Sequence, residues 1–294
     1  MPDPEPAGSV GEALRRAAER LQQAGVLNPR RESTALWAAV DGRSPGDVWL
    51  DRESRAGPEV TERFWAAVGR RVEGAPFPYA VGRAGFRSLD LLADPRALIP
   101  RPETEGLVGL VLEWAANRGG DRRGLAADVG TGTGCIALAL AMEGDFAGVV
   151  ATERSAGAAA LARENVARVA PAVPVEVREG NLLEPLAGAR YRVIVSNPPY
   201  LTEAEYEALE PSVRAFEPRE ALASGPDGLA ATRGLLAGAA PLLEPGGILA
   251  FEIDERRGDE VRRLAHEHGW RRIGIHDDLF GRPRFALAFP GEDV

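Results

Sequence analysis

The residues best suited to chemistry in this chain are the tetrapeptide Asn197-Pro198-Pro199-Tyr200, which directly follows the apolar run Tyr191–Ser196. Each proline restricts the backbone of the residue before it, so the Asn197 side chain and the neighbouring carbonyl groups are held in fixed directions. Fixed acceptors at the end of a buried strand can bind a planar NH2 group. The same residues suit an ordinary turn, because Asn-Pro begins turns and Pro-Pro ends strands. Taken alone, the tetrapeptide fits both interpretations.

A glycine-rich segment ends another predicted strand, Leu125–Val129, and precedes a helix that begins near Cys135. Glycines at every second position let a ligand approach the backbone, and a helix N-terminus presents free N–H groups. The spacing differs from the G-x-G-x-x-G of dinucleotide sites, and a tight strand-to-helix connection would also explain it. The segment, with the acid that precedes it, comprises Asp128, Val129, Gly130, Thr131, Gly132, Thr133 and Gly134.

Polar residues also follow the next two predicted strands, Gly148–Glu153 and 173–178. Glu153 stands about 20 residues beyond the glycines, a spacing at which an acid can accept hydrogen bonds from ribose hydroxyls. After the following strand, Asn181 can bind the edge of an adenine ring while Leu182 packs on its face. A solvated carboxylate and a simple turn are the alternatives for these residues.

Composition limits the class of protein. The 294 residues, 45% of them hydrophobic, suit one large domain and one small one. A net charge of −9 gives no general attraction to nucleic acid or anionic membranes. All 35 basic residues are arginine, so lysine Schiff-base chemistry and a Walker-type phosphate loop are excluded.

Cysteine and histidine are too few for a disulfide or a metal cluster, since Cys135 is the single cysteine and the three histidines are scattered. The N-terminal residues lack the basic and then apolar order of a signal peptide, and no apolar run reaches membrane-spanning length. We therefore expect a cytoplasmic protein with no metal and no membrane contact.

The first 78 residues predict a small helical domain. Helical spacing recurs in segments separated by Gly, Pro and Asn: residues 10–24, 29–40, 44–49 and 58–71. The charges nearly cancel, with 11 Arg against 12 acidic residues, which favours docking to a protein over binding nucleic acid. A purely structural cap fits equally well. Residues 79–100 alternate in polarity and predict a linking β-hairpin, with an irregular loop as the alternative.

Residues 101–294 alternate between helix and strand, which predicts an α/β domain with a mainly parallel sheet covered on both faces. A helix is expected at 105–117 and strands at 125–129, 148–153, 173–178, 191–196 and 248–253. Residues 270–276 and 284–289 suit an antiparallel edge hairpin, which makes seven strands. Ligands of such sheets bind at the carboxyl ends of the strands, where all the polar segments above are found.

The joint order of these strand ends resembles the class I, Rossmann-like S-adenosylmethionine-dependent methyltransferases. In such enzymes Asn-Pro-Pro-Tyr after the fourth strand is the signature for methylating a planar NH2 group of a nucleobase or a glutamine. The flanking segments closely resemble the HemK-type protein-glutamine N5-methyltransferases, and residues 28–40 are similar to the branch that modifies peptide chain release factors. The likeness spans residues 10–289 and rests on LIPRPETE (98–105), DVGTGTGCIA (128–137), VSNPPY (195–200), FEPREAL (216–222) and HDDLFGRPR (276–284).

This resemblance implies the chemistry of the site. The substrate would be the Gln of the Gly-Gly-Gln loop in class I release factors, whose amide donates to the Asn197 side-chain oxygen and the Pro198 carbonyl while Tyr200 packs on its plane. Pro199 completes the catalytic tetrapeptide, and Glu103 and Glu217 are candidates for shaping the substrate pocket, although surface carboxylates would look the same. S-adenosylmethionine would be bound by Asp128, Gly130, Thr131, Gly132, Thr133, Gly134, Glu153, Asn181, Leu182 and Asn197.

Some positions depart from the family pattern. Asn181 stands where such enzymes usually have Asp, which predicts weaker binding of the adenine amino group. Glu153 is longer than the usual Asp. In the helical domain, Glu32-Ser33-Thr34 replaces a more acidic pattern, which concerns docking and not chemistry.

Other functions remain open at this point. A glutamine in a ribosomal protein is the close alternative substrate. An adenine-N6 methyltransferase of nucleic acid would normally add a basic, aromatic-rich recognition region, against which the acidic charge argues. A cofactor-binding protein without catalysis is least compatible with an intact Asn-Pro-Pro-Tyr. We expect class I release factors as partners, no direct contact with nucleic acid, and a monomer when free.

Overall fold

The structure is a computed structural model that describes residues 8–117 and 123–291. The chain divides into two compact units, Met1–Arg83 and Ala84–Val294. Residues 79–81, where the linking hairpin was expected to start, belong instead to a short helix, α5 (Phe77–Val81). Pro78 occupies the first turn of this helix and Gly82 ends it at φ 74°, a left-handed conformation that favours glycine. The hairpin itself is shorter and consists of β1 (Arg83–Phe86) and β2 (Leu89–Leu92).

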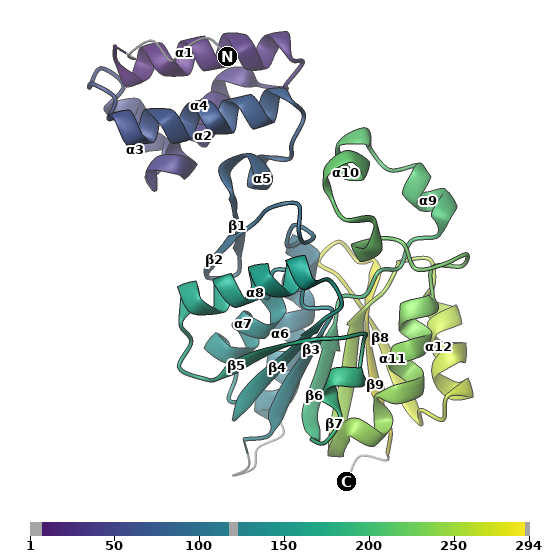
Figure 1. Ribbon diagram of the computed structural model, residues 1–294. Helices are drawn as coiled ribbons and strands as arrows, with labels where there is room; N and C mark the ends of the chain where they lie inside the picture. The colour runs from purple at the N-terminus through teal and green to yellow at the C-terminus, as the bar shows by residue number, and fades with distance from the viewer. Residues whose placement is uncertain (1–7, 118–122, 292–294) are drawn as a thin grey trace. The chain divides into compact units, whose positions relative to one another are not determined.

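The first unit is a bundle of short helices (Figure 1): α1 (Val10–Gln23), α2 (Pro29–Asp41), α3 (Pro45–Leu50), α4 (Pro58–Val72) and α5. Proline in the first turn begins α2, α3 and α4, and a capping box between Ser44 and Asp47 fixes the start of α3. Trp37 and Phe64 pack in the core with ring centroids 4.8 Å apart. Glu32, one of the departures from the family pattern, pairs with Arg71 at 2.7 Å inside this unit.

A seven-stranded sheet forms the centre of the second unit, in the order β5-β4-β3-β6-β7-β9-β8. The strands are β3 (Leu125–Val129), β4 (Gly148–Glu153), β5 (Val175–Glu179), β6 (Tyr191–Ser196), β7 (Leu243–Glu252), β8 (Arg272–Asp277) and β9 (Pro283–Phe289). Strands β3 to β7 are parallel, and β9 runs antiparallel to both β7 and β8. The predicted mainly parallel sheet with an antiparallel edge hairpin is therefore confirmed.

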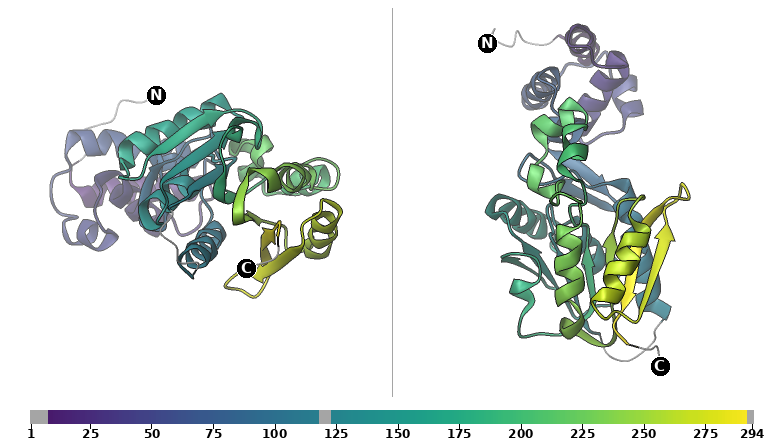
Figure 2. Two further views of the ribbon diagram at one scale, coloured as in Figure 1. Left: turned by 90° about the horizontal axis from the view of Figure 1, so that it is seen from below. Right: turned by 90° about the vertical axis from the view of Figure 1, so that its right-hand side faces the viewer.

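Helices cover both faces of this sheet (Figure 2). Alternate residues of each central strand enter different cores: Val193 and Val195 pack with α6 (Pro102–Asn117) and α7 (Cys135–Glu143), whereas Ile194 packs with α11 (Ala230–Gly238) and α12 (Gly258–Glu267). This period of two explains why the buried strands are apolar throughout. The remaining helical segments are α8 (Ala156–Val169), α9 (Glu203–Glu207), α10 (Pro211–Phe216), η1 (Glu184–Leu186), η2 (Arg219–Ala221) and η3 (Ala240–Leu242).

Strand β7 begins five residues earlier than the expected strand at 248–253, at Leu243. The Pro245-Gly246-Gly247 sequence, which is typical of a turn, is accommodated inside the strand by a register shift against β6. Gly246 has φ 76°, a conformation available to glycine at little cost. Within the described residues, no helix has both the length and the apolar character needed to cross a membrane.

Candidate active site

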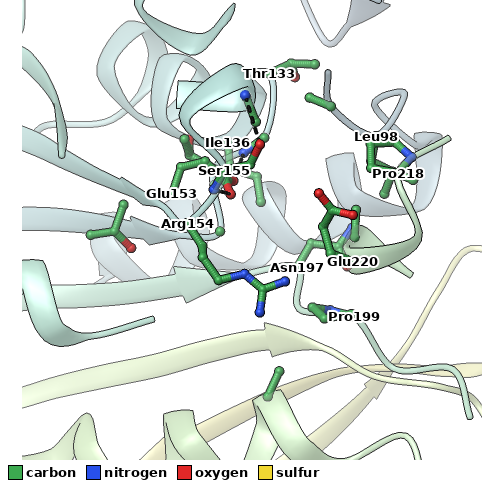
Figure 3. Close-up of a pocket in the computed structure, with 18 of the residues that line it drawn as sticks. Leu98, Thr133, Ile136, Glu153, Arg154, Ser155, Asn197, Pro199, Pro218 and Glu220 are labelled. Atoms are coloured by element: carbon green, nitrogen blue, oxygen red, sulfur yellow. Dashed lines mark hydrogen bonds between the residues drawn. The ribbon is translucent and has the colours of Figure 1, made fainter. Parts of the chain in front are cut away.

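The carboxyl ends of neighbouring parallel strands meet at one edge of the sheet. Val129 at the end of β3 is in register with Thr152 of β4 on one side and with Ser196 of β6 on the other. The segments that follow these strands border a single cavity of about 410 Å³, a size typical of small-molecule sites. The close-up in Figure 3 shows Glu153 and Thr133 on one wall and Asn197, Pro199 and Glu220 on another.

Most of the predicted site residues are brought together at this cavity. Those that line it are Gly130, Thr131, Gly132, Thr133, Glu153, Asn181, Leu182, Asn197 and Pro199. The predicted residues that are absent from the described lining are Asp128, Gly134, Pro198, Tyr200, Glu103 and Glu217. Each of these six lies behind or beside the wall, and several hold lining residues in place.

Asp128 is fully buried beneath the glycine segment. Its Oδ2 atom accepts hydrogen bonds from the Thr131 hydroxyl at 2.5 Å and from the Ala137 backbone N–H at 3.0 Å. Burial raises the pKa of Asp128 to about 7, and the two hydrogen bonds oppose that rise. Gly130 has φ 73°, and a Cβ atom there would meet no protein atom within 4 Å. Asp128 thus fixes the shape of the segment, and the glycine keeps the cavity wall open.

The Glu153 carboxylate is held against the same segment. One oxygen accepts from the Gly132 backbone N–H at 3.0 Å and the other from the Ser155 N–H at 2.9 Å. A carboxylate offers about four acceptor positions, so it keeps capacity for two hydroxyl donors from a ligand. Adjacent hydroxyls of a ribose have this donor pattern.

The turn after β5 adds an apolar part to the cavity. Leu182 adopts φ 47°, and its carbonyl accepts a hydrogen bond from the Thr152 hydroxyl at 2.8 Å, which stabilises this unusual backbone conformation. Leu182 and Ile136 line the cavity together with the Asn181 amide. An apolar surface beside an amide and a carboxylate with free acceptor positions fits the nucleoside part of S-adenosylmethionine.

Asn197 directly follows β6, which is paired with β3, so it lies beside the segment that follows β3. Its Nδ2 atom donates to Thr104 Oγ1 at 2.9 Å, and Thr104 Oγ1 in turn donates to Glu252 Oε2 at 2.8 Å. Thr104 and Glu252 are each only 2% exposed. No residue in the described part of the chain donates to Asn197 Oδ1. An unused acceptor therefore remains on a lining side chain, as recognition of an N–H donor requires.

The rest of the tetrapeptide is anchored behind Asn197. The Tyr200 carbonyl accepts from Arg257 Nη1 at 3.1 Å, and burial raises the pKa of the Tyr200 phenol to about 12, with Glu252 contributing in the same direction. Tyr200 is therefore a neutral aromatic side chain at all ordinary pH values. Pro198 is buried.

Glu217 and Glu103 each have a structural role next to the cavity. Glu217 is 5% exposed and accepts from Arg101 Nη2 with both oxygens, at 2.7 and 2.8 Å, and from the Ile99 N–H at 3.3 Å. Because Ile99 and Arg101 line the cavity, Glu217 fixes that wall from behind. Glu103 lies in the first turn of α6, where a carboxylate favours the helix N-terminus.

Several residues at the site were not identified as candidates from the sequence: Thr104, Arg154, Glu220 and Glu252. For two of them, Glu252 and Arg154, the sequence did contain a signal. Glu252 is an acid at the carboxyl end of the fifth parallel strand, where the rule for α/β sheets places ligands. Arg154 directly follows Glu153, and its guanidinium extends toward the Asn197 side of the cavity (Figure 3). Among the described residues, no three His, Cys, Asp or Glu side chains are grouped to hold a metal ion.

Comparison with known proteins agrees with this geometry. Residues 12–82 match the family model described as PrmC N-terminal domain, and residues 110–215 match Methyltransferase small domain. The chain is 40% identical to the release factor glutamine methyltransferase of Moorella thermoacetica, over 97% of this chain and 100% of that protein. It is 38% identical to the protein of the same name in Deinococcus radiodurans, over 94% and 96% of the two chains.

A solved structure supports the fold. The N-terminal domain of human METTL16, in complex with SAH, superposes with a TM-score of 0.55 at 15% identity, covering 87% of this chain and 94% of that one. At this identity the likeness concerns the fold alone.

Proposed function

The chain belongs to the release factor glutamine methyltransferase family, and from that premise we propose that it methylates the side-chain nitrogen of the Gln in the Gly-Gly-Gln loop of class I peptide chain release factors. The methyl donor is S-adenosylmethionine. The single observation that best supports this function is the unused Asn197 Oδ1 acceptor at the cavity that Glu153 also borders. The neutral balance of charge in the helical unit suits docking of a protein partner.

The residues of the cavity suit each part of the cofactor. Glu153 would accept from the ribose hydroxyls, Asn181 and Leu182 would contact the adenine, and Gly130 and Gly132 would allow the methionine part to approach the backbone. When bound, S-adenosylmethionine supplies an electrophilic methyl group on a positively charged sulfur.

Recognition of the glutamine amide explains why two acceptors are needed. An amide nitrogen is a poor nucleophile because its lone pair is delocalised into the carbonyl. Asn197 Oδ1 and the Pro198 carbonyl would accept its two N–H bonds and direct the lone pair toward the methyl donor, while Tyr200 packs against the amide plane. These hydrogen bonds strengthen as positive charge develops on nitrogen, so they stabilise the transition state more than the ground state.

The proposed function can be tested by incubating the purified protein with methyl-labelled S-adenosylmethionine and separate acceptors. The acceptors are a class I release factor, its Gln-to-Ala variant in the Gly-Gly-Gln loop, a ribosomal protein with a methylatable glutamine, and duplex DNA. We expect label only on the unaltered release factor. Label on the variant or on DNA contradicts the proposal, and label on the ribosomal protein alone favours the close alternative.

Replacing Asn181 by Asp is expected to strengthen cofactor binding. A carboxylate accepts a hydrogen bond from an adenine amino group more strongly than a neutral amide does, which corresponds to a gain of about threefold to tenfold in affinity. Calorimetric titration with S-adenosylmethionine measures the dissociation constant, and Asn181→Ala provides the control that removes the contact. An affinity of Asn181→Asp equal to or below that of the unaltered protein would reject the assignment of this residue to adenine.

A further inference from the structure

Three side chains from different elements form a continuous hydrogen-bonded series that leads to the cavity: the buried Glu252 at the end of β7, the buried Thr104 in the first turn of α6, and the half-buried Asn197 after β6. We propose that Glu252 and Thr104 are positioning residues that orient the Asn197 side-chain amide, so that its oxygen and not its NH2 group faces the substrate nitrogen. The inference rests on the proposed function for the identity of the substrate. The series itself is a property of the folded chain.

The direction of the series follows from the chemistry of the groups. A carboxylate only accepts hydrogen bonds, so Thr104 must use its single hydroxyl proton toward Glu252 Oε2, 2.8 Å away. Thr104 Oγ1 can then only accept from Asn197, at 2.9 Å. The Asn197 atom facing Thr104 is consequently the NH2 nitrogen, and the oxygen points the other way. With Glu252 ionised, the donor and acceptor chemistry of these groups alone fixes the amide orientation.

The orientation matters because a turned amide would reverse the recognition. Asn197 would then present N–H donors to a substrate that also donates N–H, and the acceptor that stabilises developing charge would be lost. Burial protects the series from exchange with water, since Thr104 and Glu252 are each 2% exposed. A hydrogen bond in such surroundings is costly to leave unmade.

The charge state of Glu252 determines whether the hydrogen bonds of the series keep their direction. Burial raises the pKa of Glu252 to about 7; the Thr104 hydrogen bond and the charges of Arg284 and Arg101 oppose the rise, whereas Glu103 adds to it. The nearby Tyr200 phenol remains neutral. Lowering the pH through about 7 therefore protonates Glu252, which can then donate to Thr104 and free the Thr104 proton to turn toward Asn197. Methyl transfer is expected to fall as the pH decreases through this value.

Two matched variants at Thr104 distinguish the effect of the hydroxyl group from the effect of the side-chain shape. Thr104→Val keeps the shape and removes the hydroxyl, and we expect kcat to fall by about 10- to 100-fold with little change in the dissociation constant of S-adenosylmethionine. Thr104→Ser keeps the hydroxyl and is expected to restore kcat to within about threefold of the unaltered protein. Equal losses in both variants, or an unchanged kcat in a folded Thr104→Val protein, would overturn the proposal.

A measurement without substrate keeps the inference separate from the proposed function. In 15N-labelled protein, the side-chain NH2 signals of Asn197 are assigned by their disappearance in Asn197→Ala. We expect them to shift in Thr104→Val, to stay in place in Thr104→Ser, and to titrate with a midpoint near pH 7 in the unaltered protein. Asn197 NH2 signals that change neither in Thr104→Val nor with pH would refute the proposed hydrogen-bonded series. Signals that respond as expected in a protein that methylates no release factor would refute only the proposed function.

Discussion

Replacing Asn197 by Ala is expected to reduce kcat for methyl transfer by about 100- to 1000-fold, the cost of removing one hydrogen-bonding group that acts on developing charge. The dissociation constant of S-adenosylmethionine should change little. Asn197 lies after β6, whereas Glu153, Asn181 and Leu182, which suit the nucleoside, follow β4 and β5. The substitution therefore removes an acceptor for the substrate amide and leaves the nucleoside contacts intact.

The measurement pairs single-turnover transfer rates at saturating cofactor with calorimetric titration of the cofactor. Asn181→Ala is the matched control, since it truncates the same side-chain type on the same cavity at the adenine end. It should weaken cofactor binding and preserve the transfer rate once the cofactor is saturating. Equal losses of rate and cofactor affinity in Asn197→Ala would mean that this residue supports the fold or the cofactor instead of the substrate amide.

The second unit was largely predictable because its strands are bounded by strong local signals. Tyr191–Ser196 is a continuous apolar run that Asn-Pro-Pro terminates, and it forms β6 with the expected bounds. Parallel strands place their carboxyl ends at one edge, so the neighbourhood of Gly130, Glu153, Asn181 and Asn197 followed from topology without any knowledge of side-chain contacts.

Features that depend on contacts between distant segments were not predictable in the same way. The bond between Thr104 and Asn197 joins residues 93 positions apart, and no local pattern specifies it. The same holds for the pairing of the Glu217 carboxylate with Arg101, which fixes the cavity wall from behind. The early start of β7 was missed because Gly246 and Gly247 suggest a turn, and only pairing with β6 overrides that preference.

Replacing Gly228 by Ala is expected to lower the free energy of unfolding by about 2 to 4 kcal/mol, as the sum of two costs. Gly228 has φ 75°, where an alanine side chain costs about 1 kcal/mol. In addition, the Cβ atom of an alanine at position 228 would overlap the Tyr200 carbonyl oxygen and lie 3.2 Å from Cζ of Arg257. The overlapped oxygen accepts the Arg257 hydrogen bond at 3.1 Å, so neither group can move without breaking the anchor of the tetrapeptide.

Gly281→Ala is the matched control for this substitution, because Gly281 has φ 73° but a Cβ atom there would meet nothing within 4 Å. It should cost only about 1 kcal/mol, the backbone part of the effect. Urea unfolding of both variants measures the difference, and transfer rates of the folded fraction report whether the tetrapeptide has moved. Because Tyr200 is three residues from Asn197, relief of the overlap by movement of the Tyr200 carbonyl would displace the acceptor and lower kcat. Equal stability of the two variants with an unchanged rate would show that the close approach of Gly228 to Tyr200 does not hold the tetrapeptide in place.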